Sequence, residues 1–154
     1  MRCAVLTVSD RASAGVYADE AGPIVERILL DAGHTIEARA VIPDEQDKIE
    51  HALRAWADER RADVIVATGG TGLGPRDVTP EAVRAVVEKE APGIAEAMRA
   101  AGMQITPFAA LSRQVAGARG NTLIVCVPGS PKAAAESLDA IIEILPHAVE
   151  MLRA

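Results

Sequence analysis

The sequence predicts a three-layer α/β fold in which helices cover both faces of a mostly parallel sheet. Short apolar runs rich in β-branched residues alternate along the chain with amphipathic helical patterns, as they do in right-handed strand–helix–strand units. Most of these runs show no alternation of polar and apolar residues, which is typical of strands buried on both faces. The chain has 154 residues, the length of one domain with one core, and we expect residues 1–154 to form that domain.

Four segments are predicted to form the main strands. Residues 3–8, 64–68 and 122–127 are almost continuously apolar and are bounded by turn residues, so we expect them at the centre of the sheet. Residues 35–42 alternate between apolar and polar side chains, which favours an outer strand. A short strand at residues 114–118, turning back into the last central strand, would make one edge of the sheet antiparallel.

Helical patterns fill the spaces between these strands. Apolar residues recur at helical spacing over residues 24–32, 49–57, 82–87 and 138–145, with charged residues on the opposite sides of the first two. A break at Ala91-Pro92-Gly93 precedes a further helix over residues 94–103. We expect Pro146 to interrupt the last long helix and a single turn to follow it.

Three hydroxyl residues, Thr79, Thr106 and Ser130, each precede a proline. A hydroxyl at the N-cap accepts a hydrogen bond from the first turn, and proline fits the first helical position because its missing N–H would have no partner there. We therefore expect these three residues to cap helices. Two of these starts follow the carboxyl ends of predicted parallel strands, where open α/β sheets bind their ligands, so we expect the functional site at this edge.

The composition argues against several classes of protein. Sixteen Lys and Arg against 22 Asp and Glu give a net charge of −6, and there are only three aromatic residues, so we expect no nucleic-acid partner. Cys3 and Cys126 stand among apolar residues and are predicted to be buried thiols, which suits a reducing compartment. No run approaches the roughly 18 apolar residues of a membrane span, and the first run is too short for a signal peptide. We expect a cytoplasmic protein without a membrane partner.

A glycine-rich loop follows the strand at residues 64–68. Residues 69–74 contain four glycines in six positions. Because residues without Cβ tolerate positive φ, such a loop can turn several backbone N–H groups toward one anion, and we favour phosphate binding over a plain turn, which needs only one or two glycines. The loop is neither a Walker A motif, since no Gly-Lys-Ser/Thr follows, nor a dinucleotide fingerprint, since Pro75 stands in place of the third glycine.

Charged residues accompany this loop. Arg76 and Asp77 lie between the glycines and Thr79, where Arg76 could hold a phosphate and Asp77 a metal ion, although an Asx turn would also explain Asp77. Asp44, at the end of the outer strand, either belongs to the same site or caps the next helix. The three histidines are far apart in the sequence, so neither a zinc cluster nor a Ser-His-Asp arrangement is indicated.

Six short segments, in this order, resemble those of the MogA/MoaB-type molybdopterin adenylyltransferases. They read VSDR, IPDEQ, TGGTG, RDVTPEA, LSR and PGSP, and they begin at residues 8, 42, 68, 76, 111 and 128. The resemblance covers nearly the whole chain and implies the molybdopterin-binding fold. It also implies Mg²⁺-dependent transfer of AMP from ATP to the terminal phosphate of molybdopterin, with release of pyrophosphate. Molybdate-inserting and competence-damage-type proteins share this fold, so the fold alone does not fix the activity.

The resemblance implies roles for individual residues. Asp44 and Asp77 match the family's two active-site aspartates, and we expect them to be catalytic and to hold Mg²⁺. The other matching positions are expected to bind the two substrates, and the residues do not indicate which loop binds which: Ser9, Arg11, Thr68, Gly69, Gly70, Thr71, Gly72, Arg76, Ser112, Arg113, Pro128, Gly129 and Ser130. Family members form trimers or hexamers, so a homotrimer or homohexamer is expected, with a molybdotransferase as partner.

Two other functions are compatible with the same residues. A scaffold protein would hold molybdopterin for a partner without turnover. A general nucleotide- or flavin-phosphate-binding α/β domain would use the glycine loop and the helix N-termini alone. Because this chain keeps both aspartate-containing segments, which look degenerate in some family members, an active enzyme is favoured.

Overall fold

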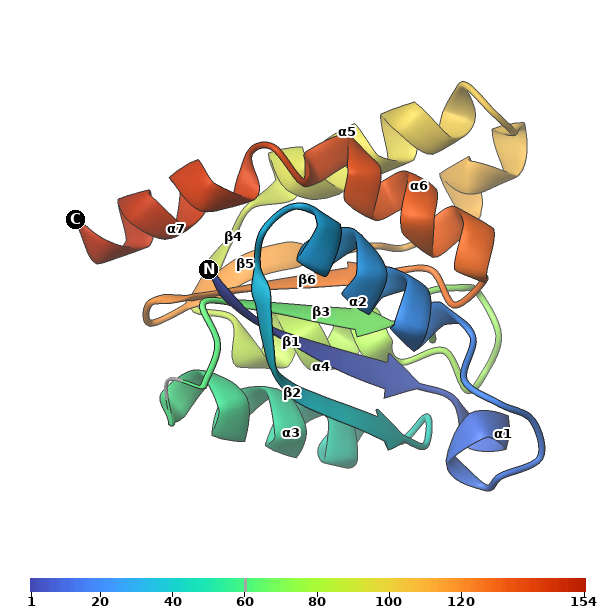
Figure 1. The fold of residues 1–154 in the computed structure, drawn as a ribbon. Helices are drawn as coiled ribbons and strands as arrows, with labels where there is room; N and C mark the ends of the chain where they lie inside the picture. Colours follow the sequence, from blue (N-terminus) through green and yellow to red (C-terminus); the bar gives the residue numbers. More distant parts are fainter. Residues whose placement is uncertain (60) are drawn as a thin grey trace.

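A six-stranded sheet lies between two layers of helices in the computed structural model, which describes residues 1–59 and 61–154 (Figure 1). The strand order is β2-β1-β3-β6-β5-β4. The predicted three-layer α/β fold is therefore confirmed. The strands are β1 (Arg2–Val8), β2 (Thr35–Ile42), β3 (Val64–Thr68), β4 (Lys89–Glu90), β5 (Ala116–Arg119) and β6 (Thr122–Val127).

Four neighbouring strands of the sheet are parallel and the remaining edge is antiparallel. β1 pairs in parallel with β2 and β3, and β3 pairs in parallel with β6. β5 runs antiparallel to β6, and β4 runs antiparallel to β5. The predicted outer strand and the predicted antiparallel hairpin are confirmed, although β5 begins two residues later than expected. β4 was not predicted, because two charged residues carry no strand signal of their own.

The helices divide between the two faces of the sheet, four on one face and two on the other (Figure 1). Two shorter elements, α1 (Asp10–Ser13) and the 3₁₀ helix η1 (Pro107–Leu111), lie in connecting segments. Within the described residues, no helix combines the length and the apolar character needed to cross a bilayer. The first face is covered by α2 (Ala21–Asp31), α5 (Pro92–Met103), α6 (Pro131–Ile141) and α7 (Leu145–Arg153), and the second by α3 (Gln46–Asp58) and α4 (Thr79–Val86).

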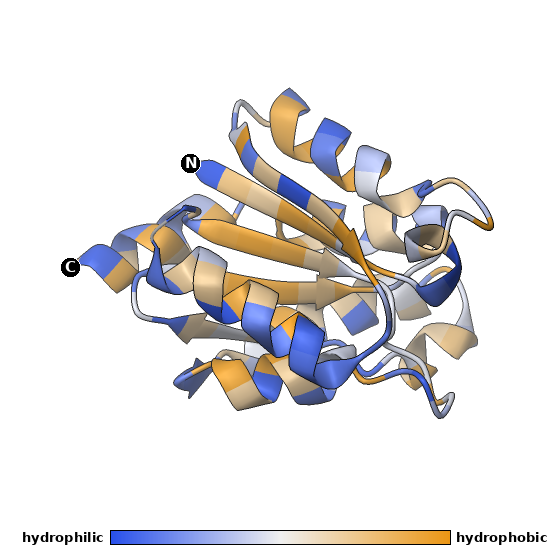
Figure 2. Ribbon diagram, turned by 90° about the horizontal axis from the view of Figure 1, so that it is seen from below, coloured by the Kyte–Doolittle hydropathy of each residue, from blue (hydrophilic) through white to orange (hydrophobic). Residues whose placement is uncertain are grey.

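The core has two halves because alternate residues of each central strand point to opposite faces. Cys3 and Val5 of β1 pack under the first layer of helices, whereas Ala4 and Leu6 pack under the second. Figure 2 shows central strands that are apolar along most of their length and helices in which hydrophobic and hydrophilic residues alternate. Cys3 and Cys126 are free and buried, as predicted, and burial raises the pKa of each thiol to about 11.

The helix boundaries correct two predictions. Pro146 does not interrupt a long helix: α6 ends at Ile141, and α7 begins at Leu145, so that Pro146 occupies the first turn of a nine-residue helix, where its missing N–H has no partner to lose. Ser130 and Thr106 are N-caps that accept hydrogen bonds from Ala133 N and Phe108 N, but Thr106 begins a 3₁₀ helix. Thr79 is not a cap, because α4 already includes it.

Candidate functional site

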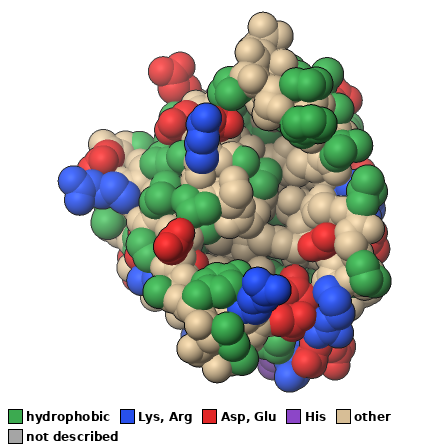
Figure 3. All heavy atoms as spheres, turned by 90° about the vertical axis from the view of Figure 1, so that its right-hand side faces the viewer, with side chains coloured by type: hydrophobic (Ala, Val, Ile, Leu, Met, Phe, Trp, Pro, Cys, Tyr) green, Lys and Arg blue, Asp and Glu red, His purple; other side chains and the backbone are tan. Residues whose placement is uncertain are grey.

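The loops that follow the four parallel strands meet at one edge of the sheet, on the right of Figure 1. Figure 3 shows this edge, which is hollowed near its centre. A cleft of about 280 Å³ lies between the ends of β1 and β3 and the start of α6. A second hollow of about 230 Å³ lies beyond the turn at residues 128–131, against α5, α6 and η1. The carboxyl edge of the sheet thus offers two neighbouring hollows on either side of one turn.

The glycine loop forms one wall of the first cleft. Gly69 and Gly70 have φ angles of +106° and +67°, which only glycine adopts without strain in this loop. Gly69 N donates to Val127 O at 3.0 Å, which joins the loop to the end of β6. Within the described part of the chain, the N–H groups of Gly70, Thr71 and Gly72 have no acceptor. The loop therefore keeps backbone donors available for an anion.

Asp77 folds back over the same loop. Its Oδ2 accepts a hydrogen bond from Gly74 N at 2.8 Å, and its own N–H donates to Gly74 O at 3.1 Å. A Cβ on Gly72 or Gly74 would lie 2.9 or 2.8 Å from Asp77 Oδ2. These two glycines therefore make room for the carboxylate, a role that differs from the anion binding expected of the whole loop.

Asp44, which lines the cleft, exchanges hydrogen bonds with Asp10. Asp44 Oδ2 accepts from Asp10 N at 2.8 Å, and Asp10 Oδ1 accepts from Asp44 N at 3.0 Å. Asp44 does not cap α3, whose N-cap is Glu45. Burial raises the pKa of the Asp44 carboxyl, and the charges of Asp10 and Asp77 act in the same direction, outweighing the hydrogen bond from Asp10 N.

Arg76 holds Asp10 from the solvent side. Its Nε and Nη2 each donate to one carboxylate oxygen of Asp10 at 3.0 Å, and this bidentate pair lowers the pKa of Asp10. The guanidinium that the sequence suggested for a phosphate thus forks onto a carboxylate in this structure. Asp10, the third residue of the VSDR segment, therefore belongs to the site although the sequence did not predict it as a site residue.

Arg113 ties the glycine loop to α4. Its guanidinium donates to Gly72 O and Asp77 O, each at 2.8 Å, and pairs with Glu81, whose pKa it lowers. The backbone N–H of Arg113 donates to Thr71 O at 2.8 Å. All these bonds are made to the protein itself, so Arg113 fixes the shape of the loop.

The structure brings nine of the fifteen predicted site residues to the walls of the two hollows. The first cleft is lined by Ser9, Asp44, Thr68, Gly69, Gly70, Asp77 and Gly129, and the second by Ser112 and Pro128. The remaining predicted residues line neither hollow and belong to the segments around them: Arg11, Thr71, Gly72, Arg76, Arg113 and Ser130.

Sequence reasoning missed the cleft wall next to α2. Asp19 Oδ2 accepts from Thr7 Oγ1 at 2.7 Å, and Asp19 Oδ1 accepts from Gly22 N at 2.9 Å, so that this carboxylate binds a backbone N–H of the first turn of α2 beside the cleft. Tyr17 OH lies 3.1 Å from Ser9 Oγ. An Asp two residues before a helix is a capping signal that could have been found, whereas nothing local to Tyr17 indicates its place in the site.

The cleft residues fit a magnesium ion that arrives with a phosphate ligand. Asp44 and Asp77 both line the cleft, and Oδ1 of each accepts no hydrogen bond from the described residues. The described chain contains no group of three or more His, Cys, Asp or Glu side chains placed to hold a metal by themselves. Mg²⁺ typically takes one or two carboxylates and completes its shell with water and substrate phosphates, which is what two aspartates beside a phosphate-binding loop would allow.

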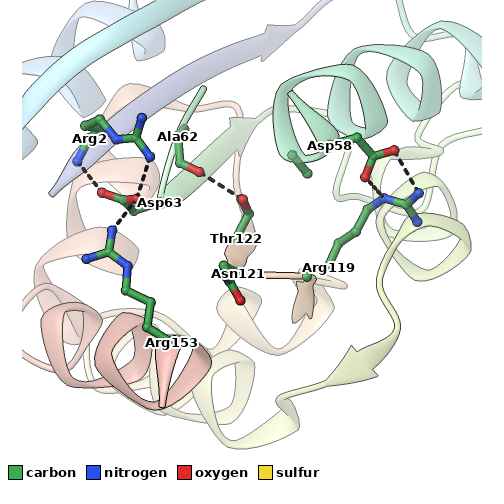
Figure 4. A pocket seen from close by; sticks show the side chains of 10 residues that line it. Arg2, Asp58, Ala62, Asp63, Arg119, Asn121, Thr122 and Arg153 are labelled. Carbon is green, nitrogen blue, oxygen red and sulfur yellow. Dashed lines mark hydrogen bonds and ion pairs between the residues drawn. The ribbon is translucent and has the colours of Figure 1, made fainter. Parts of the chain in front are cut away.

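Another hollow, of about 480 Å³, lies at the opposite edge of the sheet and is lined by charged side chains that pair with one another (Figure 4). Asp63 accepts hydrogen bonds from Arg2 N, from the Arg2 guanidinium and from Arg153, at 2.8, 3.1 and 2.6 Å. Asp58 and Arg119 form a bidentate pair at 2.8 and 3.0 Å. Because the charged groups here neutralise one another, we assign this hollow a structural role and place the candidate site at the carboxyl edge.

An α/β protein with backbone N–H donors and aspartates at a cleft on the carboxyl edge of its sheet is the class that this fold and this site define. The sequence matches the family described as "Probable molybdopterin binding domain" over residues 4–147, and the chain belongs to that family. The resemblance of the six segments is thereby confirmed.

Relatives and solved structures agree with this assignment. The chain is 41% identical over 150 residues to a molybdopterin adenylyltransferase of Helicobacter pylori J99, covering 96% of this chain and 85% of that one. It is 43% identical to the Escherichia coli K12 protein of the same name, covering 92% and 73%. The structure of the molybdopterin biosynthesis enzyme MoaB of Thermus thermophilus superposes with a TM-score of 0.93 at 47% identity, covering 98% and 95% of the two chains.

Some relatives are much longer than this chain. It is 42% identical to the Drosophila melanogaster "Molybdenum cofactor synthesis protein cinnamon", but it spans only 25% of that protein. Gephyrin of Dictyostelium discoideum is 38% identical, and this chain spans 22% of it. The same domain therefore occurs both by itself and as part of longer proteins.

Proposed function

We propose that this protein is a molybdopterin adenylyltransferase, which transfers AMP from ATP to the terminal phosphate of molybdopterin with Mg²⁺ and releases pyrophosphate. One observation carries the proposal: two aspartates, Asp44 and Asp77, share a cleft with a glycine loop in which the N–H groups of residues 70–72 lack an acceptor within the described chain. Relatives 41–44% identical that are named molybdopterin adenylyltransferase support it.

The chemistry requires two anions to meet. An oxygen of the molybdopterin phosphate forms a bond to the α-phosphorus of ATP, and the bond from that phosphorus to the bridging oxygen breaks, so that pyrophosphate leaves with the electron pair. The attacking group is already anionic, so the protein needs no nucleophile of its own and must chiefly align the reactants and neutralise their charge.

Residues of the carboxyl edge would perform these tasks. The backbone N–H of Gly70, which lines the first cleft, and that of Lys132, which has no acceptor among the described residues in the first turn of α6, would bind phosphate oxygens. Asp44 and Asp77 would hold Mg²⁺, which supplies positive charge against the phosphates when bound. The two hollows on either side of residues 128–131 provide room for two substrates, with Ser112 and Pro128 in the second.

The test is an assay of pyrophosphate release with purified protein, ATP and Mg²⁺, with and without molybdopterin. We expect release only when molybdopterin is present. Asp77→Asn should lower turnover by about 10²-fold or more, because it removes a charge placed to act on the reacting phosphates. Asp31→Asn, the same substitution on the exposed surface of α2, is the matched control and should leave turnover unchanged.

Other results would identify the alternatives. Molybdopterin binding without pyrophosphate release would show a scaffold protein and contradict the enzymatic proposal. A yellow protein that retains flavin through purification would favour the general phosphate-binding domain.

Assembly and partner follow from the family and are also proposals. We propose a homotrimer or homohexamer in the cytoplasm, and large apolar side chains exposed on and before η1, among them Ile105, Phe108 and Leu111, support a contact between subunits. The occurrence of this domain within longer relatives supports a partner, by family resemblance a molybdotransferase, that consumes the adenylylated product. Light scattering coupled to gel filtration measures the subunit number, and a monomer would contradict the first of these proposals.

A further inference from the structure

Thr79 carries an unusual hydroxyl. The residue is fully buried, and Thr79 Oγ1 is the buried side-chain polar atom that lacks a hydrogen-bond partner within the described chain. Other buried hydroxyls are paired: Thr68 Oγ1 donates to Pro128 O at 2.7 Å, and Thr122 Oγ1 donates to Ala62 O at 2.9 Å. An unpaired buried hydroxyl destabilises the folded state, because it loses its hydrogen bonds to water, so its presence at this site calls for a reason.

The position of this hydroxyl connects it to Asp44. Thr79 N donates to Gly70 O at 3.1 Å, so the first turn of α4 lies directly against the glycine loop. A Cβ on Gly70 would come within 3.0 Å of both Thr79 Oγ1 and Asp44 Oδ1. The two oxygens therefore flank the same glycine, and Asp44 Oδ1 is the carboxylate oxygen that is not bonded to Asp10.

Helix stability does not account for the hydroxyl. Thr79 neither caps α4 nor makes any of the hydrogen bonds described for side chains in this part of the fold. A valine has nearly the same shape and would occupy the same volume without an unpaired polar atom, so packing alone would favour valine.

We propose that Thr79 is a positioning residue of the active site, whose hydroxyl donates a hydrogen bond to Asp44 Oδ1 when nucleotide occupies the cleft and so fixes that carboxylate for the divalent cation. The inference rests on the proposed function, because it gives Asp44 a cation to hold. In the free protein the hydroxyl of Thr79 is unpaired and lies near Asp44 Oδ1, on the other side of Gly70.

The network around Asp10 explains why the bond forms only on binding. In the free protein Arg76 neutralises Asp10, and Asp10 in turn holds Asp44 by two reciprocal hydrogen bonds. A phosphate group competes with Asp10 for the guanidinium of Arg76, since both anions bind it through two oxygens. Once Arg76 turns to phosphate, the charges of Asp10 and Asp44 repel each other without compensation, and Asp44 gains from a new donor on its other side.

The test compares Thr79→Val, which removes only the hydroxyl, with Thr79→Ser, which keeps it. In urea unfolding without ligands, Thr79→Val should be at least as stable as the wild type. With Mg²⁺ and ATP, the rise in melting temperature should fall to less than half in Thr79→Val and persist in Thr79→Ser. Turnover should fall about tenfold in Thr79→Val with KM for ATP changed less than threefold, and it should stay within threefold in Thr79→Ser.

Several outcomes would overturn the proposal. Loss of stability or of folding in ligand-free Thr79→Val would show that the hydroxyl has a structural partner. A full thermal shift or full turnover in Thr79→Val would show that Asp44 does not depend on it, and failure of Thr79→Ser to recover both would assign the effect to shape. The thermal shift with Mg²⁺ and ATP requires no turnover, so it tests Thr79 even if the wild type releases no pyrophosphate.

Discussion

Both edges of the sheet carry charged hollows, but the polar groups are paired with one another at the amino edge and partly unpaired at the carboxyl edge. At the amino edge, Asp63 and Asp58 have their arginine partners, and the pKa of Asp63 is lowered. At the carboxyl edge, backbone donors and the hydroxyl of Thr79 lack partners among the described residues, and the pKa of Asp44 is raised. The smaller hollow is the better candidate because unpaired groups are costly unless a ligand completes them, whereas mutually paired charges contribute to stability by themselves.

The largest difference between the edges should come from replacing a glycine on each. Gly70→Ala places a Cβ against Thr79 at a φ of +67° and should destabilise the protein by about 3 kcal/mol. Gly120→Ala, in the amino-edge hairpin, has a φ of +53° and open space, so only the backbone strain of about 1 kcal/mol remains. Urea unfolding at pH 7 measures both, and equal losses would mean that the carboxyl edge is not closely packed around Gly70.

A second comparison uses the same substitution at both edges. Asp63→Asn should destabilise by about 1–2 kcal/mol, since it weakens three hydrogen bonds to a carboxylate whose arginine partners are half exposed. Asp44→Asn should leave the free energy of unfolding unchanged or raise it, because it removes a charge that burial and neighbouring carboxylates disfavour. A loss of stability in Asp44→Asn as large as that in Asp63→Asn would contradict the expected difference between the two edges of the sheet.

The smallest expected effect is the pH dependence of these differences. Burial acts to raise the pKa of Asp63, but the hydrogen bonds from Arg2 and Arg153 outweigh it and lower the pKa below its ordinary value of 3.8. The stability due to Asp63 is therefore complete above pH 4–5, about one unit above that value, and is lost as the pH falls through the lowered pKa.

The pH dependence of stability due to Asp44 has the opposite sign. Its raised pKa means that ionisation costs stability at neutral pH, and this cost disappears as the pH falls through that pKa toward 3.8. As the pH falls from 7 to 3, the free energy of unfolding of each Asn variant should therefore approach that of the wild type. Asp63→Asn should approach it from below and Asp44→Asn from above. Parallel curves over this range would contradict the opposite environments of the two carboxylates.

The sequence predicted the main strands well because these depend on local patterns, and it predicts the functional site at their carboxyl edge. The apolar runs at β1, β3 and β6 and the alternation of β2 record burial on two faces or one, and chain order then brings Asp44 and Asp77 to the same edge. Strand β4 was not predicted because its two charged residues carry no strand pattern and are defined as a strand by their pairing with β5.

The sequence does not show the partners that only tertiary structure supplies. The sequence gives no sign that Arg76 and Arg113 have partners. In the structure Arg76 donates hydrogen bonds to Asp10. Arg113 donates to the carbonyl oxygens of Gly72 and Asp77. Thr79 read as a cap because proline follows it, but α4 begins one residue earlier than that pattern implies. Hydrogen bonds between segments more than thirty residues apart leave no periodic signal in the chain.

Asp63 receives hydrogen bonds from the second residue of the chain and from the last residue but one, so a single carboxylate pins both termini to the side of the molecule that faces away from the cleft (Figure 1). A polypeptide joined at either terminus would leave from the back of the molecule and would not cover the mouth of the cleft. This placement makes the domain suited to covalent linkage with other modules, and it recommends the termini for attaching labels or immobilising the protein while substrates enter freely from the front.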